Sequence, residues 1–196
     1  MKNIINTHEQ GKLITFDWPD GVWKSTVVKL LAEQHWWVYY KTPGEVTMEE
    51  RDKYDLPEVS VQNRFDFYIW LLMKDAVRIR DILERWNNVF CDRFIISTVA
   101  HHKAMDESIN INWIQQILAQ IRIDCSIVLH GDISVLMQRT WSRDKQTRFE
   151  WDTELVIKTQ ENFKKYSPAY LFKNTGHPIN TTIANINHQL KELNIY

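Results

Sequence analysis

The chain has 196 residues, of which 44% are hydrophobic and 25% are charged, and its formal net charge is -1. This length fits one domain with a sizeable core, and the composition is that of an ordinary globular protein. The near-zero net charge gives no sign of a general nucleic-acid or membrane surface, so any anion site must come from a local cluster of residues.

Neither the start of the chain nor its interior predicts export or a membrane span. Residues 1–12 lack the apolar core of a signal peptide, and no apolar run is long enough to cross a bilayer. Cys91 and Cys125 each lie beside an apolar, strand-like run, so buried reduced thiols are favoured over a disulfide or a metal pair. We therefore expect a cytoplasmic protein with no nucleic-acid or membrane partner.

In chain order, the apolar pattern predicts strands that alternate with helices. Strands are expected at residues 12–17, 38–41, 88–92 and 126–130, with a weak fifth strand near 178–180. Helices are expected at residues 24–35, about 59–85, 111–121, from 133, about 153–166 and 184–193. This alternation predicts an α/β fold in one domain (residues 1–196), with a parallel sheet of five strands and helices on both faces.

The stretch FDWPDGVWKST, residues 16–26, has the spacing of a phosphate-binding loop and lies between a strand and a helix. Lys24 would reach the terminal phosphates of a nucleotide, and the Ser25 hydroxyl would complete the coordination of Mg²⁺. In the alternative interpretation, Ser25 only caps the helix and Lys24 is solvated. Both glycine positions of the motif hold tryptophan, at Trp18 and Trp23. The residues predicted to contact ATP are Trp18, Pro19, Asp20, Gly21, Val22, Trp23, Lys24, Ser25, Thr26 and the more distant Arg139.

An acid and an arginine end the third predicted strand, in the sequence VFCDRF. Ligands of open parallel sheets bind at the carboxyl ends of the strands. Asp92 would there orient Mg²⁺ or its water, and Arg93 offers a planar, permanently charged fork for a phosphate. A surface ion pair is the alternative interpretation.

A basic stretch, QRTWSRDKQTRFE, follows the fourth predicted strand and carries Arg139, Arg143, Lys145 and Arg148. A run of charges is usually a solvated helix face. Here the run interrupts two helices, so we predict a lid, at about residues 139–151, that brings cations onto a transferring phosphoryl group.

Together, these stretches resemble the thymidylate kinase family of P-loop nucleoside-monophosphate kinases, nearly from end to end. The family pattern F-[DE]-G-x-D-G-x-G-K-S-T lies over residues 16–26, with only the two tryptophans out of place. The D-R-[YF] signature lies over residues 92–94, and the Pro-Gly element lies at residues 43–44. The lid pattern ends over residues 147–150, where threonine replaces the aspartate of D-R-F-E.

The resemblance implies a P-loop kinase that moves the γ-phosphoryl group of Mg-ATP onto a nucleoside monophosphate, with dTMP giving dTDP as the preferred reaction. In that family the residue matching Asp20 contacts the acceptor, and the residue matching Arg93 holds its phosphate. Position 21 holds glycine rather than arginine, which is typical of the subtype whose lid supplies the catalytic cation. The catalytic residues implied are Lys24, Arg93, Arg143 and Arg148, and the metal residues are Ser25 and Asp92. A homodimer formed through the long helix is implied by the family alone.

Two departures from the family pattern affect the substrate. The Arg-Glu that precedes Pro-Gly in the family is Lys41-Thr42 here, and the pair of an aromatic residue and an arginine that reads thymine has no clear counterpart. Phe65, Phe67 and Tyr68 are the nearest stacking candidates, and a core role for them is equally open. The substrate-binding residues predicted are Asp20, Pro43, Gly44, Phe65, Tyr68 and Arg93. Another nucleotide or deoxynucleoside kinase, and a non-catalytic binding module, remain alternatives.

The chain has nine tryptophans and five glycines. Typical usage of about 7% glycine predicts roughly 14 in a chain of this length. Our hypothesis is a decoding artefact, in which UGA codons that specify glycine have been translated as tryptophan. Trp36-Trp37 and Trp86 lie where helix-capping glycines are expected, whereas Trp113 and Trp70 lie in helical apolar settings. The positions in question are Trp18, Trp23, Trp36, Trp37, Trp86, Trp141 and Trp151. A pseudokinase with genuine tryptophans, or deliberate substitution, are the rival explanations.

Two adjacent histidines, His101 and His102, follow the Asp-Arg-Phe signature. Adjacent residues of a helix do not face one metal together, so structural or substrate-side roles are expected for this pair.

Overall fold

The computed structural model describes residues 10–18, 24–44, 46–141, 152–166, 170–173 and 178–196, with the backbone alone at Lys24, Met48, 139–141 and 170–173. The described strands form one parallel sheet in the order β2-β3-β1-β4-β5. They are β1 (Leu13–Asp17), β2 (Val38–Lys41), β3 (Val89–Asp92), β4 (Cys125–His130) and β5 (Tyr170–Lys173). The α/β class and the parallel sheet agree with the sequence prediction.

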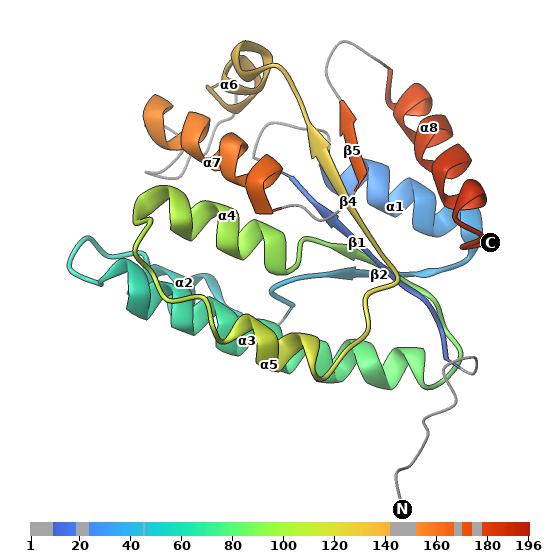
Figure 1. Ribbon diagram of the computed structural model, residues 1–196, viewed down its shortest axis with the longest axis horizontal. Helices are drawn as coiled ribbons and strands as arrows, with labels where there is room; N and C mark the ends of the chain where they lie inside the picture. Colours follow the sequence, from blue (N-terminus) through green and yellow to red (C-terminus); the bar gives the residue numbers. More distant parts are fainter. Residues whose placement is uncertain (1–9, 19–23, 45, 142–151, 167–169, 174–177) are drawn as a thin grey trace, which may run out of the picture.

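The described helices lie between these strands and after the last one (Figure 1). They are α1 (Lys24–His35), α2 (Met48–Tyr54), α3 (Val61–Leu83), α4 (Ile95–Met105), α5 (Ile114–Leu118), α6 (Ile133–Trp141), α7 (Thr153–Tyr166) and α8 (Ile179–Glu192). None of the helices in the part of the chain that the structure describes is long and apolar enough to span a membrane.

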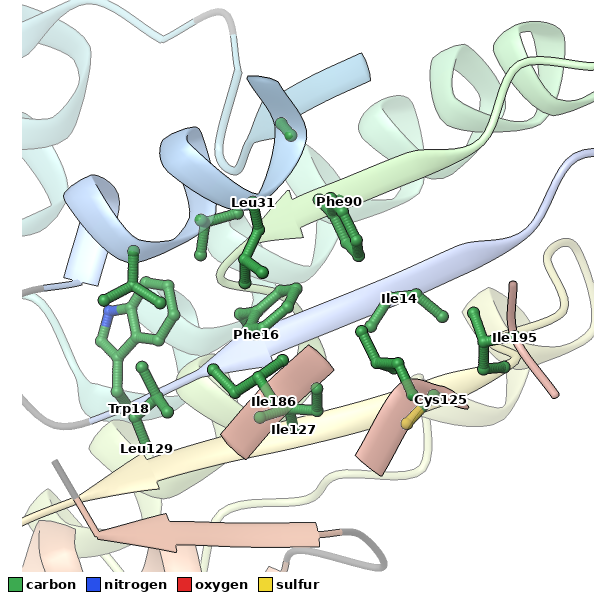
Figure 2. Packing of buried hydrophobic residues seen from close by; sticks show 14 of the residues in the cluster. Ile14, Phe16, Trp18, Leu31, Phe90, Cys125, Ile127, Leu129, Ile186 and Ile195 are labelled. Carbon is green, nitrogen blue, oxygen red and sulfur yellow. The ribbon is translucent and has the colours of Figure 1, made fainter. Parts of the chain in front are cut away.

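Strand β1 supplies side chains to two hydrophobic cores, one on each face of the sheet. Ile14 and Phe16 join residues of α1 and α8, whereas Leu13 joins residues of α3, α4 and α5. Successive residues of a strand point to opposite faces, so the burial of all of β1 requires cover on both. Figure 1 shows these layers, and Figure 2 shows the core between the sheet and α1. The carboxyl ends of the strands are the edge where such a sheet binds ligands.

Several predicted elements differ from those observed. The weak strand predicted near 178–180 is wrong, because residues 179–192 form α8 and the edge strand β5 is at residues 170–173. The helix predicted over residues 111–121 is reduced to the five residues of α5. Helices α2 and α4 were not predicted. Helix α2 has no apolar stripe and begins with a capping box in which Thr47 and Glu50 cap each other.

Two of the tryptophans in question occupy backbone positions that favour glycine. Trp36 has a φ of 58° and Trp86 a φ of 64°, and both side chains are exposed, at 95% and 63%. Each follows a helix whose end has the hydrogen bonds of a Schellman motif. After α1, the N–H of Trp37 donates to Ala32 O and that of Trp36 to Glu33 O. After α3, the N–H of Asn87 donates to Ile82 O and that of Trp86 to Leu83 O.

The same motif ends α8, where the left-handed residue is Asn194, with a φ of 54°. Asparagine tolerates this conformation because its short polar side chain bonds locally, whereas a bulky side chain is strained there. The expectation of glycine-capping positions at Trp36 and Trp86 therefore agrees with the backbone.

Trp37 and Trp18 behave differently, because both pack against the core. The ring of Trp37 stacks on Phe90 at a centroid distance of 4.4 Å. Trp18 is fully buried next to Phe16, and Figure 2 shows its indole between α1 and β4. Its Nε1–H has no hydrogen-bond partner in the described structure. The expectation of a glycine-cap residue at position 37 is wrong on this packing, and the Trp18 ring is accommodated at the cost of an unpaired donor.

Trp70 and Trp113, expected in helical apolar settings, are about half exposed, at 50% and 47%. The ammonium of Lys74 lies 3.4 Å from the Trp70 ring centroid, and the ring also stacks on Phe67, so this half-exposed indole has a cationic and an aromatic neighbour. Trp23 and Trp151 lie outside the described residues, and at Trp141 only the backbone is described.

Candidate functional site

Two carboxylates end the neighbouring strands β1 and β3. Asp17 and Asp92 are fully buried, and Asp92 is paired in register with the residue before Asp17. Asp92 Oδ2 accepts a hydrogen bond from the Tyr39 hydroxyl at 2.7 Å, and Tyr39 also shares a hydrogen bond with Ser25 in the first turn of α1. Burial, followed by the contact with Asp92, raises the pKa of Tyr39. The two predicted metal residues, Ser25 and Asp92, are thus linked through one tyrosine.

One oxygen of each carboxylate, Asp17 Oδ2 and Asp92 Oδ1, is buried without a hydrogen-bond partner among the described residues. Carboxylate oxygens without a partner in the described structure, at the ends of two neighbouring strands, fit Mg²⁺, which prefers oxygen ligands and keeps several waters. Within the described part of the chain, no three His, Cys, Asp or Glu side chains gather to hold a metal ion. A Mg²⁺ ion here would therefore complete its coordination with water and phosphate oxygens.

Asp17 also positions the turn that follows β3. Its Oδ1 accepts hydrogen bonds from Phe94 N at 2.8 Å, Ser97 N at 2.9 Å and Ser97 Oγ at 2.6 Å. These donors lie at the start of α4, where Phe94 itself provides no side-chain cap. Burial raises the pKa of Asp17, and the hydrogen bonds from Ser97 and Phe94 oppose that shift. Asp17 therefore caps α4 from another strand, a role that no local motif predicts.

Arg93 has a left-handed backbone, with a φ of 69°. Its N–H donates to Phe16 O at 2.8 Å, and its carbonyl accepts hydrogen bonds from Thr42 Oγ1 at 2.7 Å and Cys91 Sγ at 3.1 Å. These contacts hold the residue in a conformation that non-glycine residues adopt at a cost, and such conformations cluster at functional sites. The Nη1 of Arg93 lies 3.4 Å from the Nε2 of His101.

Arg93 lines a pocket of about 500 Å³, which is a typical size for a small-molecule site. The pocket lies between the turn after β2, the first half of α3, helix α4 and the start of α7. Its charged lining residues are Lys41, Arg51, Asp55, Arg64 and Arg93, and His101 and His102 add two imidazoles. Arg64 pairs with Asp55 at 2.8 Å. Since cations outnumber acids, the pocket favours an anionic ligand.

The Pro43–Gly44 turn forms one wall of this pocket. The buried carboxylate of Asp75 holds it, because Oδ2 accepts from Gly44 N at 2.9 Å and Oδ1 from the Tyr40 hydroxyl at 2.8 Å. A Cβ on Gly44 would approach Asp75 Oδ1 to 2.9 Å and the Tyr40 hydroxyl to 3.0 Å, so any other residue would force one of these side chains, or the turn itself, to shift.

Tyr68 contributes an aromatic ring to the pocket, whereas Phe65 does not. Phe65 is fully buried in the core between the sheet and α3, the alternative role for helical aromatics. The Tyr68 hydroxyl accepts a hydrogen bond from Arg51 Nε at 3.2 Å. The guanidinium groups of Arg51 and Arg64 lie 5.9 and 5.8 Å from the Tyr68 ring centroid. Arg64 and Tyr68 lie four residues apart on α3, and this helical spacing is the one feature of the sequence that could have predicted that the two side chains share a face.

His102 is the most deeply buried imidazole of the pocket lining, at 4% exposure. Its Nδ1 lies 2.7 Å from the Thr98 carbonyl oxygen, which can only accept, so Nδ1 carries the proton. Burial, aided by the charge of Arg64, lowers the pKa of His102 to about 4, so the ring is neutral at pH 7. Its Nε2 has no hydrogen-bond partner among the described residues.

The predicted site residues are therefore distributed over several places. Pro43, Gly44, Tyr68 and Arg93 line one pocket, and Ser25 and Asp92 meet through Tyr39. Thr26 is exposed on α1, and Trp18 is in the core. The predicted residues outside the described structure are Pro19, Asp20, Gly21, Val22, Trp23, Arg143 and Arg148, together with the side chains of Lys24 and Arg139.

A parallel sheet with helices on both faces, in which the central strand ends in an acid, defines an open α/β fold whose ligands bind at the carboxyl ends of the strands. Within this class, thymidylate kinases have a similar fold. The enzyme from Candida albicans matches with a TM-score of 0.79 and 17% identity, over 95% of this chain and 93% of that chain. The enzyme from Ehrlichia chaffeensis matches with a TM-score of 0.69 and 20% identity, over 92% and 98%. No protein-family model matches the sequence.

Proposed function

We propose that the protein transfers the γ-phosphoryl group of Mg-ATP to a nucleoside monophosphate that binds in the pocket lined by Arg93. The observation that carries this proposal is the position of Arg93, which joins the cationic pocket to the strand end that bears Asp92. A phosphate in the pocket would thus lie beside the edge where the start of α1 suits a polyphosphate. The thymidylate kinase fold supports the same reaction class.

The residues of the chain would act by positioning and by electrostatics, since phosphoryl transfer requires little covalent work from the protein. Arg93 would hold the acceptor phosphate, and its constrained backbone would keep the guanidinium oriented. Asp92, with Ser25, would orient the metal and its waters through the free Oδ1. Mg²⁺, when bound, neutralises charge on the β- and γ-phosphates. Lys24 and the lid arginines, Arg143 and Arg148, are proposed as the remaining cations.

dTMP is the proposed acceptor, and dTDP the product. The pocket supplies an aromatic ring, Tyr68, on which a base can stack, and its lining includes Arg93, the cation proposed to hold the phosphate. Another nucleotide or deoxynucleoside kinase activity remains the alternative within the same reaction class. Homodimerisation through α3 is a further proposal that depends on the family resemblance.

The proposed reaction requires glycine at position 23 and small residues around the loop, because the phosphate-binding loop uses bare backbone N–H groups. We therefore propose that the active protein carries glycine at positions 18 and 23. For the chain with both tryptophans we expect negligible ATP binding, measured by calorimetry.

The deciding assay is a panel of nucleoside monophosphates and nucleosides with Mg-ATP, applied to the protein with Trp18→Gly and Trp23→Gly. Diphosphate formation from dTMP supports the proposal, and transfer to nucleosides alone would favour the deoxynucleoside kinase. Arg93→Ala should lower kcat/KM for the acceptor by about 10²–10³-fold, because a donor that stabilises the reacting phosphates is lost. Absence of transfer to every acceptor would refute the proposal.

A second candidate is a non-catalytic module that binds the acceptor nucleotide. The full burial of the Trp18 indole in the core favours it, because the chain as written accommodates this ring. Such a module would bind monophosphates in the pocket yet show no turnover after the glycines are introduced. Lys24→Ala separates the two candidates, because only an enzyme would lose turnover.

A further inference from the structure

We infer that Tyr39 is a positioning residue of the proposed metal site, because its hydroxyl is interposed between the two predicted metal residues and fixes which oxygen each of them presents to the ion. The inference rests on the proposed function, since it requires that Mg²⁺ and a nucleotide bind at this strand end. It deepens that proposal by adding a residue of β2, to which neither the phosphate-loop spacing nor the family resemblance assigns a role.

Tyr39 lies between α1 and the end of β3. Its hydroxyl donates to Asp92 Oδ2 at 2.7 Å and shares a hydrogen bond with Ser25. Its ring packs against the core that contains Phe90, and Asp92 lies two residues further along β3, so the two side chains share the sheet face that α1 covers. The ammonium of Lys29, four residues after Ser25 on α1, lies 5.4 Å from the Tyr39 ring centroid. One face of α1 therefore meets this tyrosine.

The two hydrogen bonds of the Tyr39 hydroxyl have fixed directions. A phenol carries one proton, and this proton goes to the carboxylate of Asp92, which accepts it. The Tyr39 oxygen therefore has only lone pairs to offer to Ser25, so the serine hydroxyl is the donor of the second bond. The three groups form a chain in which Ser25 donates to Tyr39 and Tyr39 donates to Asp92.

This chain leaves one oxygen of each outer residue in the state that a cation requires. A hydroxyl group ligates a cation through an oxygen lone pair and must turn its proton away from the positive charge. Ser25 is in that state when its proton is bound to Tyr39. With Oδ2 engaged, Asp92 presents Oδ1, which is buried without a partner among the described residues. Loss of hydrogen-bonding partners of metal ligands typically lowers metal affinity by about 10–100-fold.

The alternative is that Tyr39 only satisfies a buried carboxylate and stabilises the fold. The next residue offers a matched comparison, because the hydroxyl of Tyr40 donates to the buried carboxylate of Asp75 at 2.8 Å. Successive residues of a strand point to opposite faces, so Tyr40 makes the same kind of bond on the face that α3 covers, away from Ser25. If the role of Tyr39 is only structural, removing either hydroxyl should have the same consequences.

The test is the binding of Mn²⁺, which like Mg²⁺ suits oxygen ligands, in the presence of ADP. It is measured by electron paramagnetic resonance on the protein with Trp18→Gly and Trp23→Gly. Tyr39→Phe removes only the hydroxyl, and we expect it to weaken Mn²⁺ binding about tenfold or more. The affinity for ADP without metal, measured by calorimetry in EDTA, should stay unchanged.

Tyr40→Phe is the matched control. It should leave the Mn²⁺ affinity unchanged, although both variants should lower the urea midpoint to a similar extent, because each removes one hydrogen bond to a buried carboxylate. Equal effects of the two variants on Mn²⁺ binding would overturn the inference.

A double variant tests whether Tyr39 acts through Ser25. Tyr39→Phe should weaken Mn²⁺ binding much less when combined with Ser25→Ala than when serine is present, because the hydroxyl that Tyr39 orients is then already absent. Losses that multiply in full would show that the two residues act independently, and would refute the hydrogen-bonded chain.

The failures of the two proposals are distinguishable. Phosphoryl transfer together with undiminished Mn²⁺ binding in Tyr39→Phe overturns the role of Tyr39 alone. Mn²⁺ binding that depends on Tyr39, without transfer to any acceptor, overturns the proposed function alone, and absence of Mn²⁺ binding in the presence of ADP overturns both. If Tyr39→Phe does not fold, ¹³C NMR of the tyrosine-labelled protein decides: Mn²⁺ with ADP should broaden the ring signal of Tyr39 more than that of Tyr40, and equal broadening would refute the inference.

Discussion

Replacing Trp36 by glycine is expected to stabilise the protein, although it removes the largest side chain that a residue can carry. The φ of 58° places Trp36 in the left-handed region, which costs a non-glycine residue about 1–2 kcal/mol. The indole is 95% exposed, so almost no burial is lost on its removal. Glycine also has more conformational freedom in the unfolded chain, and this entropy offsets about 0.5–1 kcal/mol of the stabilisation. The expected net stabilisation is about 0.5–1 kcal/mol, and Trp86→Gly should give a similar or slightly smaller gain.

Urea unfolding at 25 °C, followed by circular dichroism, measures these differences. The two substitutions lie at the ends of different helices, so their effects should add, and together they should raise the melting temperature by about 2–6 °C. Trp37→Gly is the matched control on the adjacent residue. It should cost about 3 kcal/mol, because it removes a ring stacked on Phe90. A loss of stability in both Trp36→Gly and Trp86→Gly would refute the backbone-strain argument.

Three further predictions follow from contacts in the site. Asp17→Ala should destabilise the fold by about 2–3 kcal/mol in urea unfolding, because Phe94 N and Ser97 N lose their acceptor; an unchanged midpoint would show that Asp17 does not cap α4. Gly44→Ala should raise KM for the acceptor more than it lowers kcat, because the added Cβ would displace the turn from Asp75; kinetics equal to wild type would contradict this packing. The pKa of His102 falls from 6.5 to about 4 on folding, so as the pH is lowered this residue is protonated in the unfolded chain before it is protonated in the folded protein. Wild-type stability should therefore fall relative to His102→Gln as pH drops from about 6.5 to 4, and parallel pH profiles of the two proteins would refute the shift.

The part of the site that follows strand ends was predictable from the sequence. Asp92 and Arg93 directly follow an apolar run, and the carboxyl end of a central parallel strand is where ligands bind. Pro43 and Gly44 mark a turn after another strand by their conformational preferences alone. These features are local in the chain, so pattern and spacing are sufficient to locate them.

The rest depends on packing between segments that are distant in sequence. His102 and Arg64 share a pocket only because α4 packs beside α3, and Asp17 caps α4 only because β1 and β3 are neighbours. Helix α4 escaped prediction because it is covered on more than one side, by α3 and by α7, so its sequence IISTVAHHKAM shows no single apolar stripe. The capping box of Thr47 and Glu50 was a readable signal for α2, yet that helix has no apolar face to accompany it.

The tryptophans are of two kinds, those at backbone positions that favour glycine and those whose rings pack in the core, and this difference makes the decoding hypothesis specific about individual codons. Trp36 and Trp86 sit where the backbone favours glycine and where their rings gain little from burial, whereas Trp37 has a packing role that glycine would abolish. A translation artefact therefore predicts UGA codons at 36 and 86, together with 18 and 23 in the phosphate loop, and an ordinary UGG codon at 37. UGG at positions 36 and 86 would mean instead that the chain genuinely carries two strained helix ends. The stabilisation on glycine substitution would then measure strain that the natural protein tolerates, rather than the restoration of its natural residues.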